Sequence, residues 1–178
     1  MYREILGIVG TANVAPIVDL KKPWIDNKLY FPKSYEHYVE ELGYGLLCNL
    51  FIFYLPWAGK YKMHPDSWFV QNKEMKSLFD YYIQTLLSVL NEDDKELLKS
   101  AEPFAKSENG EFLFWNRSQI LANNEMPIYC TDFSSGIHHV GNSLYDFICL
   151  VTGENYKSAL KLYTNPLPSI FKPYKEIY

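Results

Sequence analysis

The chain has 178 residues, the length of a single globular domain, and its 48% hydrophobic and 21% charged residues are ordinary proportions for a folded protein. This composition argues against intrinsic disorder, because there is enough apolar surface to offset the entropy lost on folding. The formal net charge of −4 argues against a nucleic-acid binder, which usually carries a basic patch. No apolar run approaches the roughly 20 residues of a membrane span.

The N-terminus and the cysteines indicate the compartment. The apolar stretch at residues 5–9 is shorter than the core of a secretory signal. Three cysteines without metal-ligand spacing suit a reducing cytosol, and Cys48 and Cys149 lie in apolar runs that predict buried side chains. We therefore expect a cytoplasmic protein.

The first half of the chain contains one ambiguous segment and then clear elements. Residues 5–9 fit either a short strand or one helical turn. After Pro32, apolar residues recur at helical spacing up to Gly43, a typical helix end, and form one face: Tyr35, Tyr38, Val39 and Leu42. The apolar run 46–55 predicts a buried strand that ends at Pro56.

A loop at 57–72 separates that strand from the strongest helical pattern, which runs from Met75 to Leu90. Asn91, with Asp94 three residues later, predicts the start of a shorter helix that ends before Pro103. The long helix should pack on one face of a sheet made of residues 50–55 and 112–115, with Phe79 and Leu86 buried.

Hairpin signals cluster in the second half. The Asn109-Gly110 pair predicts a turn into a strand at 112–115, and two further strands are expected at 127–133 and 137–140. Ser143 with Asp146 predicts the start of a helix that Gly153 ends, and a last helix is expected at 156–163 before an extended, proline-rich tail. Since no regular strand–helix–strand alternation exists, we predict an α+β fold, a single domain with a mainly antiparallel sheet flanked by helices.

Catalytic signatures are missing from the sequence, which has neither a nucleophile elbow nor a phosphate-binding loop. His37 and Glu41 are four residues apart on a helix, as two metal ligands could be, although a solvent-exposed polar pair is the simpler interpretation. Cys130, Asp132 and one of the two histidines 138–139 could meet across a hairpin as a cysteine–histidine pair; neighbouring strand residues point to opposite faces, so both histidines cannot bind one metal. We expect no catalytic residue, metal or cofactor.

Large side chains gather in the loop at 57–72, outside any periodic element, and they include Trp57, Tyr61 and Trp68. Two interpretations are open. The two tryptophans fold back over the core, or the loop is a contact surface, because tryptophan and tyrosine often supply the binding energy of protein interfaces.

Several segments together resemble the SUKH superfamily. The stretch FPKSYEHYVEELGYG at 31–45 resembles its opening helix, and LFIFYLP at 50–56 resembles its next strand. Three later segments resemble its second half: FLFWN at 112–116, MPIYCTDFSSGIHHVGNSLYDFI at 126–148 and FKPY at 171–174. The resemblance covers about residues 30–174 and implies a non-enzymatic α+β scaffold.

What the resemblance implies about function is protein binding. Many bacterial members look like immunity proteins that neutralise toxins, often nucleases or deaminases, and others, the yeast cell-wall-synthesis regulators among them, look like interaction modules. We expect an immunity protein; the alternatives are a regulatory interaction module and an enzyme or small-ligand binder without a visible motif. The expected partner is a cognate toxin, not nucleic acid or membrane. The expected contact residues are three aromatic and three acidic side chains: Trp57, Tyr61, Trp68, Glu36, Glu40 and Glu41.

Overall fold

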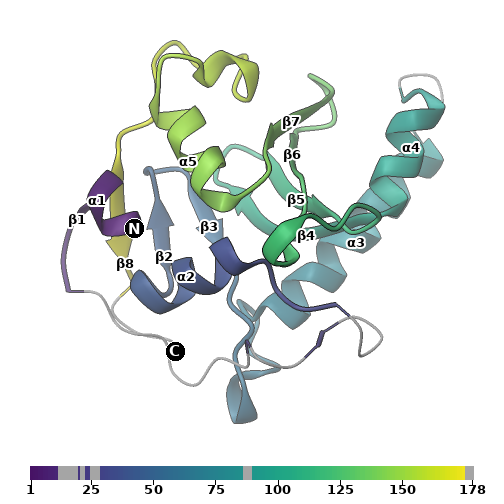
Figure 1. Ribbon diagram of the computed structural model, residues 1–178. Helices are drawn as coiled ribbons and strands as arrows, with labels where there is room; N and C mark the ends of the chain where they lie inside the picture. Colours follow the sequence, from purple (N-terminus) through teal and green to yellow (C-terminus); the bar gives the residue numbers. More distant parts are fainter. Residues whose placement is uncertain (12–19, 21–22, 25–28, 86–89, 175–178) are drawn as a thin grey trace.

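The computed structural model describes residues 1–11, 20, 23–24, 29–85 and 90–174. They build one eight-stranded sheet with the order β1-β8-β2-β3-β4-β5-β6-β7 (Figure 1). The strands are β1 (Gly7–Ile8), β2 (Gly45–Leu47), β3 (Phe51–Phe53), β4 (Ala101–Ser107), β5 (Phe112–Asn116), β6 (Ile128–Thr131), β7 (Ile137–Gly141) and β8 (Ile170–Pro173). Every neighbouring pair is antiparallel except β1 and β8, which confirms the predicted mainly antiparallel α+β arrangement.

Helices cover both faces of this sheet. The helices are α1 (Tyr2–Ile5), α2 (Lys33–Glu41), α3 (Trp68–Thr85), α4 (Glu92–Lys99) and α5 (Leu144–Thr152). Figure 1 shows α2 and α5 in front of the sheet, where their aromatic rings meet those of β3. The helix α4 and the part of α3 around Phe79 pack against the opposite face and form a second core, whereas Trp68 and Met75 near the start of α3 belong to the first core. No helix in the described part of the chain is long and apolar enough to cross a membrane.

In strand β5, successive side chains point to opposite faces of the sheet and so enter different cores. Trp115 points toward α2, where its ring lies 5.1 Å from that of Tyr35. Phe114 points the other way, and its ring lies 5.5 Å from that of Phe79 on α3. The predicted packing of the long helix on residues 112–115 is therefore confirmed, although Phe51 and Phe53 pack on the opposite face. Leu86 lies outside the described residues.

The predicted helix boundaries depend on caps, and these are confirmed. Asn91 Oδ1 accepts the backbone N–H of Asp94 at 2.8 Å, and Ser143 Oγ accepts that of Asp146 at 3.1 Å. The helix α2 ends at Glu41, and Gly43 follows with a φ of 75°, a left-handed conformation that glycine adopts without strain.

Three predicted elements are wrong in extent or kind. The run 46–55 is a tight hairpin, because Cys48 and Asn49 both adopt a positive φ and Leu50 donates back to the Leu47 carbonyl at 3.0 Å. The predicted helix 156–163 is only a short 3-10 turn at Tyr156–Ser158. The helix α3 begins at Trp68, so it takes up part of the predicted loop.

One strand and one cysteine also depart from expectation. Strand β4 passes through Pro103, its register shifts between Pro103 and Ala105, and the sequence pattern predicts no strand there. The predicted extended tail is confirmed, since Ile170–Pro173 form β8, an interior strand between β1 and β2. Cys149 is exposed, since it lies on the outer side of α5, whereas Cys48 is buried as expected.

Candidate functional site

Trp57 and Trp68 belong to the core, so the prediction that they contact a partner is wrong. Their exposed fractions are 0% and 3%. The Trp57 ring packs edge-on against Tyr44, and the Trp68 indole N–H donates to the Pro103 carbonyl at 3.2 Å. The interpretation in which the two tryptophans fold back over the core is the correct one.

The tryptophans fix the base of the loop between them. The backbone N–H groups of Trp57 and Trp68 both donate to the Leu55 carbonyl, at 2.9 and 2.8 Å. The loop tip carries Tyr61, which is half-buried, and Met63, which is 77% exposed. Tyr61 is therefore the one aromatic residue of the predicted contact set that a partner can reach.

The three predicted glutamates of α2 lie in different surroundings. Glu40 is exposed, and Glu36 is half-buried and forms an ion pair with Lys33 at 2.8 Å. Glu41 turns toward α1, where its carboxylate accepts the backbone N–H groups of Tyr2 at 2.8 Å and Arg3 at 3.3 Å. Partial burial alone would raise the pKa of Glu41, but these donors and the terminal amine hold it below its ordinary value. Glu41 thus stabilises the fold and is not free for a partner.

The carboxylates of α2 belong to a larger acidic surface, which we call the acidic face. It consists of six carboxylates from α1, α2, the turn before β6 and α5, with two basic side chains among them. Its members are Glu4, Glu36, Glu40, Glu41, Glu125, Asp146, Arg3 and Lys33. Three of them, Glu125, Glu41 and Asp146, lie close enough to the Tyr2 hydroxyl to raise its pKa, of which burial is the chief cause. The terminal amine of Met1 also belongs here, since it lies 3.3 Å from the Glu41 carboxylate, so three formal negative charges remain unbalanced on this face, against a formal net charge of −4 for the whole chain.

Glu125 and Ser34 join the elements of this face. Glu125 accepts the backbone N–H of Ser34 at 2.7 Å and its hydroxyl at 2.8 Å. The same hydroxyl oxygen accepts the backbone N–H of Leu144, the first residue of α5, at 2.9 Å, and the Ser34 carbonyl accepts the Tyr2 hydroxyl at 2.8 Å. Burial raises the pKa of Glu125. The first turns of α2 and α5 are therefore held together through one serine.

Sequence reasoning missed half of the acidic carboxylates. Glu125 is 91 residues from Ser34 and lies in a polar loop, so no local pattern could place it there. Asp146 was recognised only as part of a helix start. A metal pair of His37 and Glu41 is the less favoured interpretation; the Glu41 carboxylate accepts N–H groups of α1 instead, and the described residues contain no group of three or more potential metal ligands.

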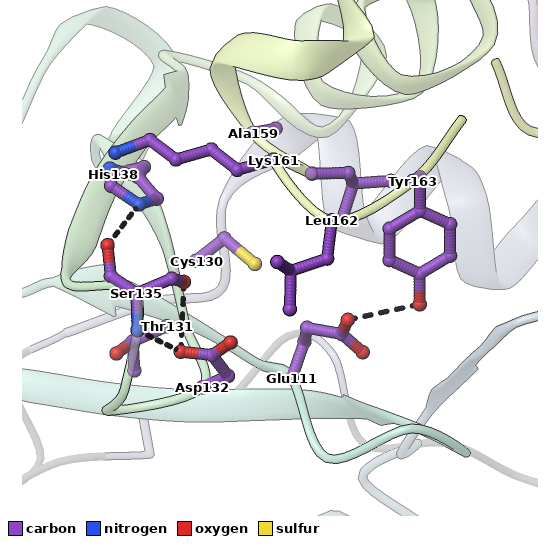
Figure 2. A pocket seen from close by; sticks show the side chains of 11 residues that line it. Glu111, Cys130, Thr131, Asp132, Ser135, His138, Ala159, Lys161, Leu162 and Tyr163 are labelled. Carbon is purple, nitrogen blue, oxygen red and sulfur yellow. Dashed lines mark hydrogen bonds between the residues drawn. The ribbon is translucent and has the colours of Figure 1, made fainter. Parts of the chain in front are cut away.

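A small recess lies at the end of β6 and β7, beside the segment 159–163 (Figure 2). Cys130 and His138 are opposite each other in the β6–β7 ladder and both line it, whereas His139 points to the other face and its ring meets Tyr129. His138 Nε2 donates to the Ser135 carbonyl at 2.9 Å, because a carbonyl can only accept.

The recess does not hold an activated nucleophile. Burial, followed by the nearby carboxylates of Glu111 and Asp132, raises the pKa of the Cys130 thiol well above its ordinary value. A reactive cysteine needs the opposite shift. The hydrogen bond of His138 goes to a backbone carbonyl, and Figure 2 shows the sulfur of Cys130 turned toward Leu162 instead of the imidazole. The predicted cysteine–histidine pair therefore meets in space without the geometry of a catalytic pair.

Comparison with known proteins adds no assignment. The chain matches no family model, no curated protein and no solved structure. The resemblance to the SUKH superfamily remains a prediction from the sequence segments.

Proposed function

We propose that this chain is a protein-binding module whose acidic face docks a basic partner, and that its biological role is that of an immunity protein. The partner would be a cognate toxin, of which a nuclease is the most suitable class, since an enzyme that handles nucleic acid carries a basic surface. The observation that supports this proposal is the concentration of unbalanced negative charge on one rigid face.

The acidic face has the properties that steer association. Glu36 and Glu40 lie on one helix, and Arg3, Lys33 and the terminal amine are the cationic groups that the described part of the chain places among the six carboxylates. Unbalanced surface charge raises the rate at which oppositely charged proteins meet, often by orders of magnitude, and the effect falls with salt. The link between α2 and α5 through Ser34 keeps this face in one arrangement, so little ordering entropy is lost on binding.

Binding in the cytoplasm is part of the same proposal. The three cysteines are all free, as suits a reducing compartment. An immunity protein acts where the toxin acts, so cell fractionation should recover the chain with cytosolic markers. Recovery in a secreted or envelope fraction would contradict this part of the proposal.

The experiment uses toxins encoded beside the gene as candidate partners and measures their association rate by stopped flow. Replacing Glu36→Lys and Glu40→Lys together should slow association at least tenfold at low salt and flatten its salt dependence. The matched control is Asp80→Lys with Asp93→Lys, which changes the net charge equally at exposed positions on α3 and α4. Equal slowing by both double variants, or by neither, would contradict the proposal.

A further inference from the structure

Strand β7 ends the sheet and leaves one edge open. It pairs with β6 through Ile137, His138 and His139, and no strand in the described part of the chain pairs with its other side. Exposed edges usually carry lysine or proline, which discourage pairing with another chain. β7 has neither, and its only irregularity is the extra residue Val140, which ends the regular ladder. Residues 137–139 are therefore a short pairing edge without lysine or proline.

The recess lies on one side of this edge. A residue added opposite His138 would place its side chain on the same sheet face as His138 and Cys130, which is the face of the recess. Figure 2 shows the carboxylates of Asp132 and Glu111 within it, with Lys161 and His138 as the basic groups on its rim. Partial burial alone would raise the pKa of Asp132, but donors from Ser134 and Ser135 lower it, so this carboxylate is ionised at neutral pH.

Two carboxylates against one ammonium group favour a cationic side chain in the recess. Leu162 lines the recess and is 76% exposed, so it offers an apolar contact for the methylene stem of a lysine or arginine. An added strand could therefore form backbone hydrogen bonds with β7, and one of its side chains on the recess face would lie beside the two carboxylates.

The edge is continuous with the acidic face. Directly after β7, the backbone N–H of Asn142 donates to the Asp146 carboxylate at 3.1 Å, and Asp146 is a member of that face. The helix α5 packs on β7 and carries Asp146 in its first turn. The acidic face and the β7 edge therefore adjoin at Asp146, so a basic partner held by the acidic face lies beside the β7 edge.

We propose that β7 receives an extended basic segment of the protein partner as an added ninth strand, with a lysine or arginine of that segment over the recess. This inference rests on the proposed function, because it takes the partner to be basic, and it adds the way in which the partner is held. Backbone hydrogen bonds to residues 137–139 supply the register, and the two carboxylates supply the charge preference.

The first test uses a capped six-residue peptide of alternating lysine and valine as the probe, with binding measured by isothermal titration or fluorescence. Two control peptides carry either N-methylvaline or N-methyllysine at the same positions, so the charge and side chains are kept while the backbone donors along one edge or the other are lost. The unmodified peptide should bind at least tenfold more tightly than one of the two controls and should slow deuterium exchange of β7 amides. Equal binding of all three peptides, or no binding, would overturn the inference.

The second test changes the protein at the edge. Adjacent residues of a strand direct their N–H groups to opposite sides, so proline at one of His138 and His139 removes an outward donor, and proline at the other breaks a bond to β6. The variant that keeps the wild-type melting temperature should bind the lysine–valine peptide at least tenfold more weakly. The alanine variant at that position should bind normally. If proline there changes nothing, strand addition is excluded.

The outcomes separate the two proposals. In one outcome, the peptides bind without preference while toxin association still depends on Glu36 and Glu40. This result would overturn strand addition and leave the proposed function standing. In the other outcome, the unmodified peptide is clearly preferred but toxin association does not change when Glu36 and Glu40 are replaced. This result would contradict the proposed function and leave the β7 edge as a strand-binding site.

Discussion

Glu40 and Glu41 are neighbours in sequence, but their carboxylates lie in different surroundings. Glu40 faces solvent, and Glu41 accepts N–H groups of α1. Because the pKa of Glu41 is lowered in the folded protein, its contribution to stability is present above the pKa of the unfolded chain and is lost as the pH falls through the lower folded value. The same residue type therefore serves folding at one position and is open to binding at the next.

Glu41→Gln should lower the free energy of unfolding by about 1 kcal/mol at pH 7, as the loss of a helix cap does. The difference from the wild type should shrink as the pH falls below the ordinary pKa of glutamate and through the lower folded value, where the wild-type carboxyl is itself protonated. Urea unfolding at pH 7 and at acidic pH measures both values. Glu40→Gln is the control and should stay within about 0.5 kcal/mol of the wild type. Equal effects at the two positions would show that Glu41 is not a cap.

Trp57 gives the second prediction at the scale of the residue. Its fully buried ring packs against Tyr44 and His64. Trp57→Ala should therefore cost about 3–5 kcal/mol of stability, as large-to-small core substitutions do. Tyr61→Ala should cost distinctly less than Trp57→Ala, because Tyr61 is only half-buried where it packs against the core. A Trp57→Ala variant with wild-type stability and weaker partner binding would restore the contact-surface interpretation.

At the scale of the element, the starts of helices could be predicted from the sequence, whereas turns inside apolar runs and contacts between distant segments could not. The starts of α4 and α5 followed from Asn91 and Ser143 because a cap involves residues only three apart. The turn at Cys48 and Asn49 needs two positive φ angles, and although Asn49 favours such a conformation, the apolar residues on both sides of it favour one continuous strand. The same limit applies to the candidate site: composition picked out Glu40, whereas Glu125 joins the acidic face only through the packing of the 122–125 turn on α2.

The packing of α3 on β4 contains a buried charge whose partners are unequal. The Glu102 carboxylate is 1% exposed and accepts from Lys76 Nζ at 2.6 Å and an Arg117 guanidinium nitrogen at 3.1 Å. Asn72 donates to its other oxygen at 3.1 Å. The two cations keep about a third of their side-chain surface in contact with solvent, so they can be hydrated without Glu102, whereas Glu102 cannot be hydrated without them.

Removing the cations should therefore cost more than removing the buried carboxylate. Lys76→Met with Arg117→Met leaves an uncompensated buried charge and should lose about 3–5 kcal/mol of stability in chemical denaturation. Glu102→Gln should cost distinctly less, because its amide can still accept from Asn72. A larger loss of stability for Glu102→Gln would contradict this prediction. It would mean that the attraction between the carboxylate and its cations contributes more to stability than the desolvation of an unpaired charge costs.

At the scale of the whole molecule, β8 joins segments from both ends of the chain. It pairs with β1 on one side and β2 on the other, and Phe171 packs on Tyr38 beneath α2. Gly45 lies where β2 and β8 approach most closely. A methyl group there would meet the Lys172 carbonyl oxygen, the Phe171 ring at 2.6 Å and Pro173 Cα at 2.9 Å. Two of these three atoms belong to the backbone of β8, so they can move only if the strands separate.

Gly45→Ala should thus open the β2–β8 pairing and lower the stability of the whole fold by about 1–3 kcal/mol, the usual cost of overpacking, or more. Gly7→Ala on β1 is the matched control, since its nearest contact would be an ordinary 3.7 Å. Urea unfolding gives the two free energies, and deuterium exchange of β8 amides locates the loss. Because the acidic face rests on this part of the sheet through α2, Gly45→Ala should weaken partner binding only in proportion to the unfolded fraction. Normal exchange in β8 together with a binding defect would show instead that the β2–β8 edge itself contacts the partner.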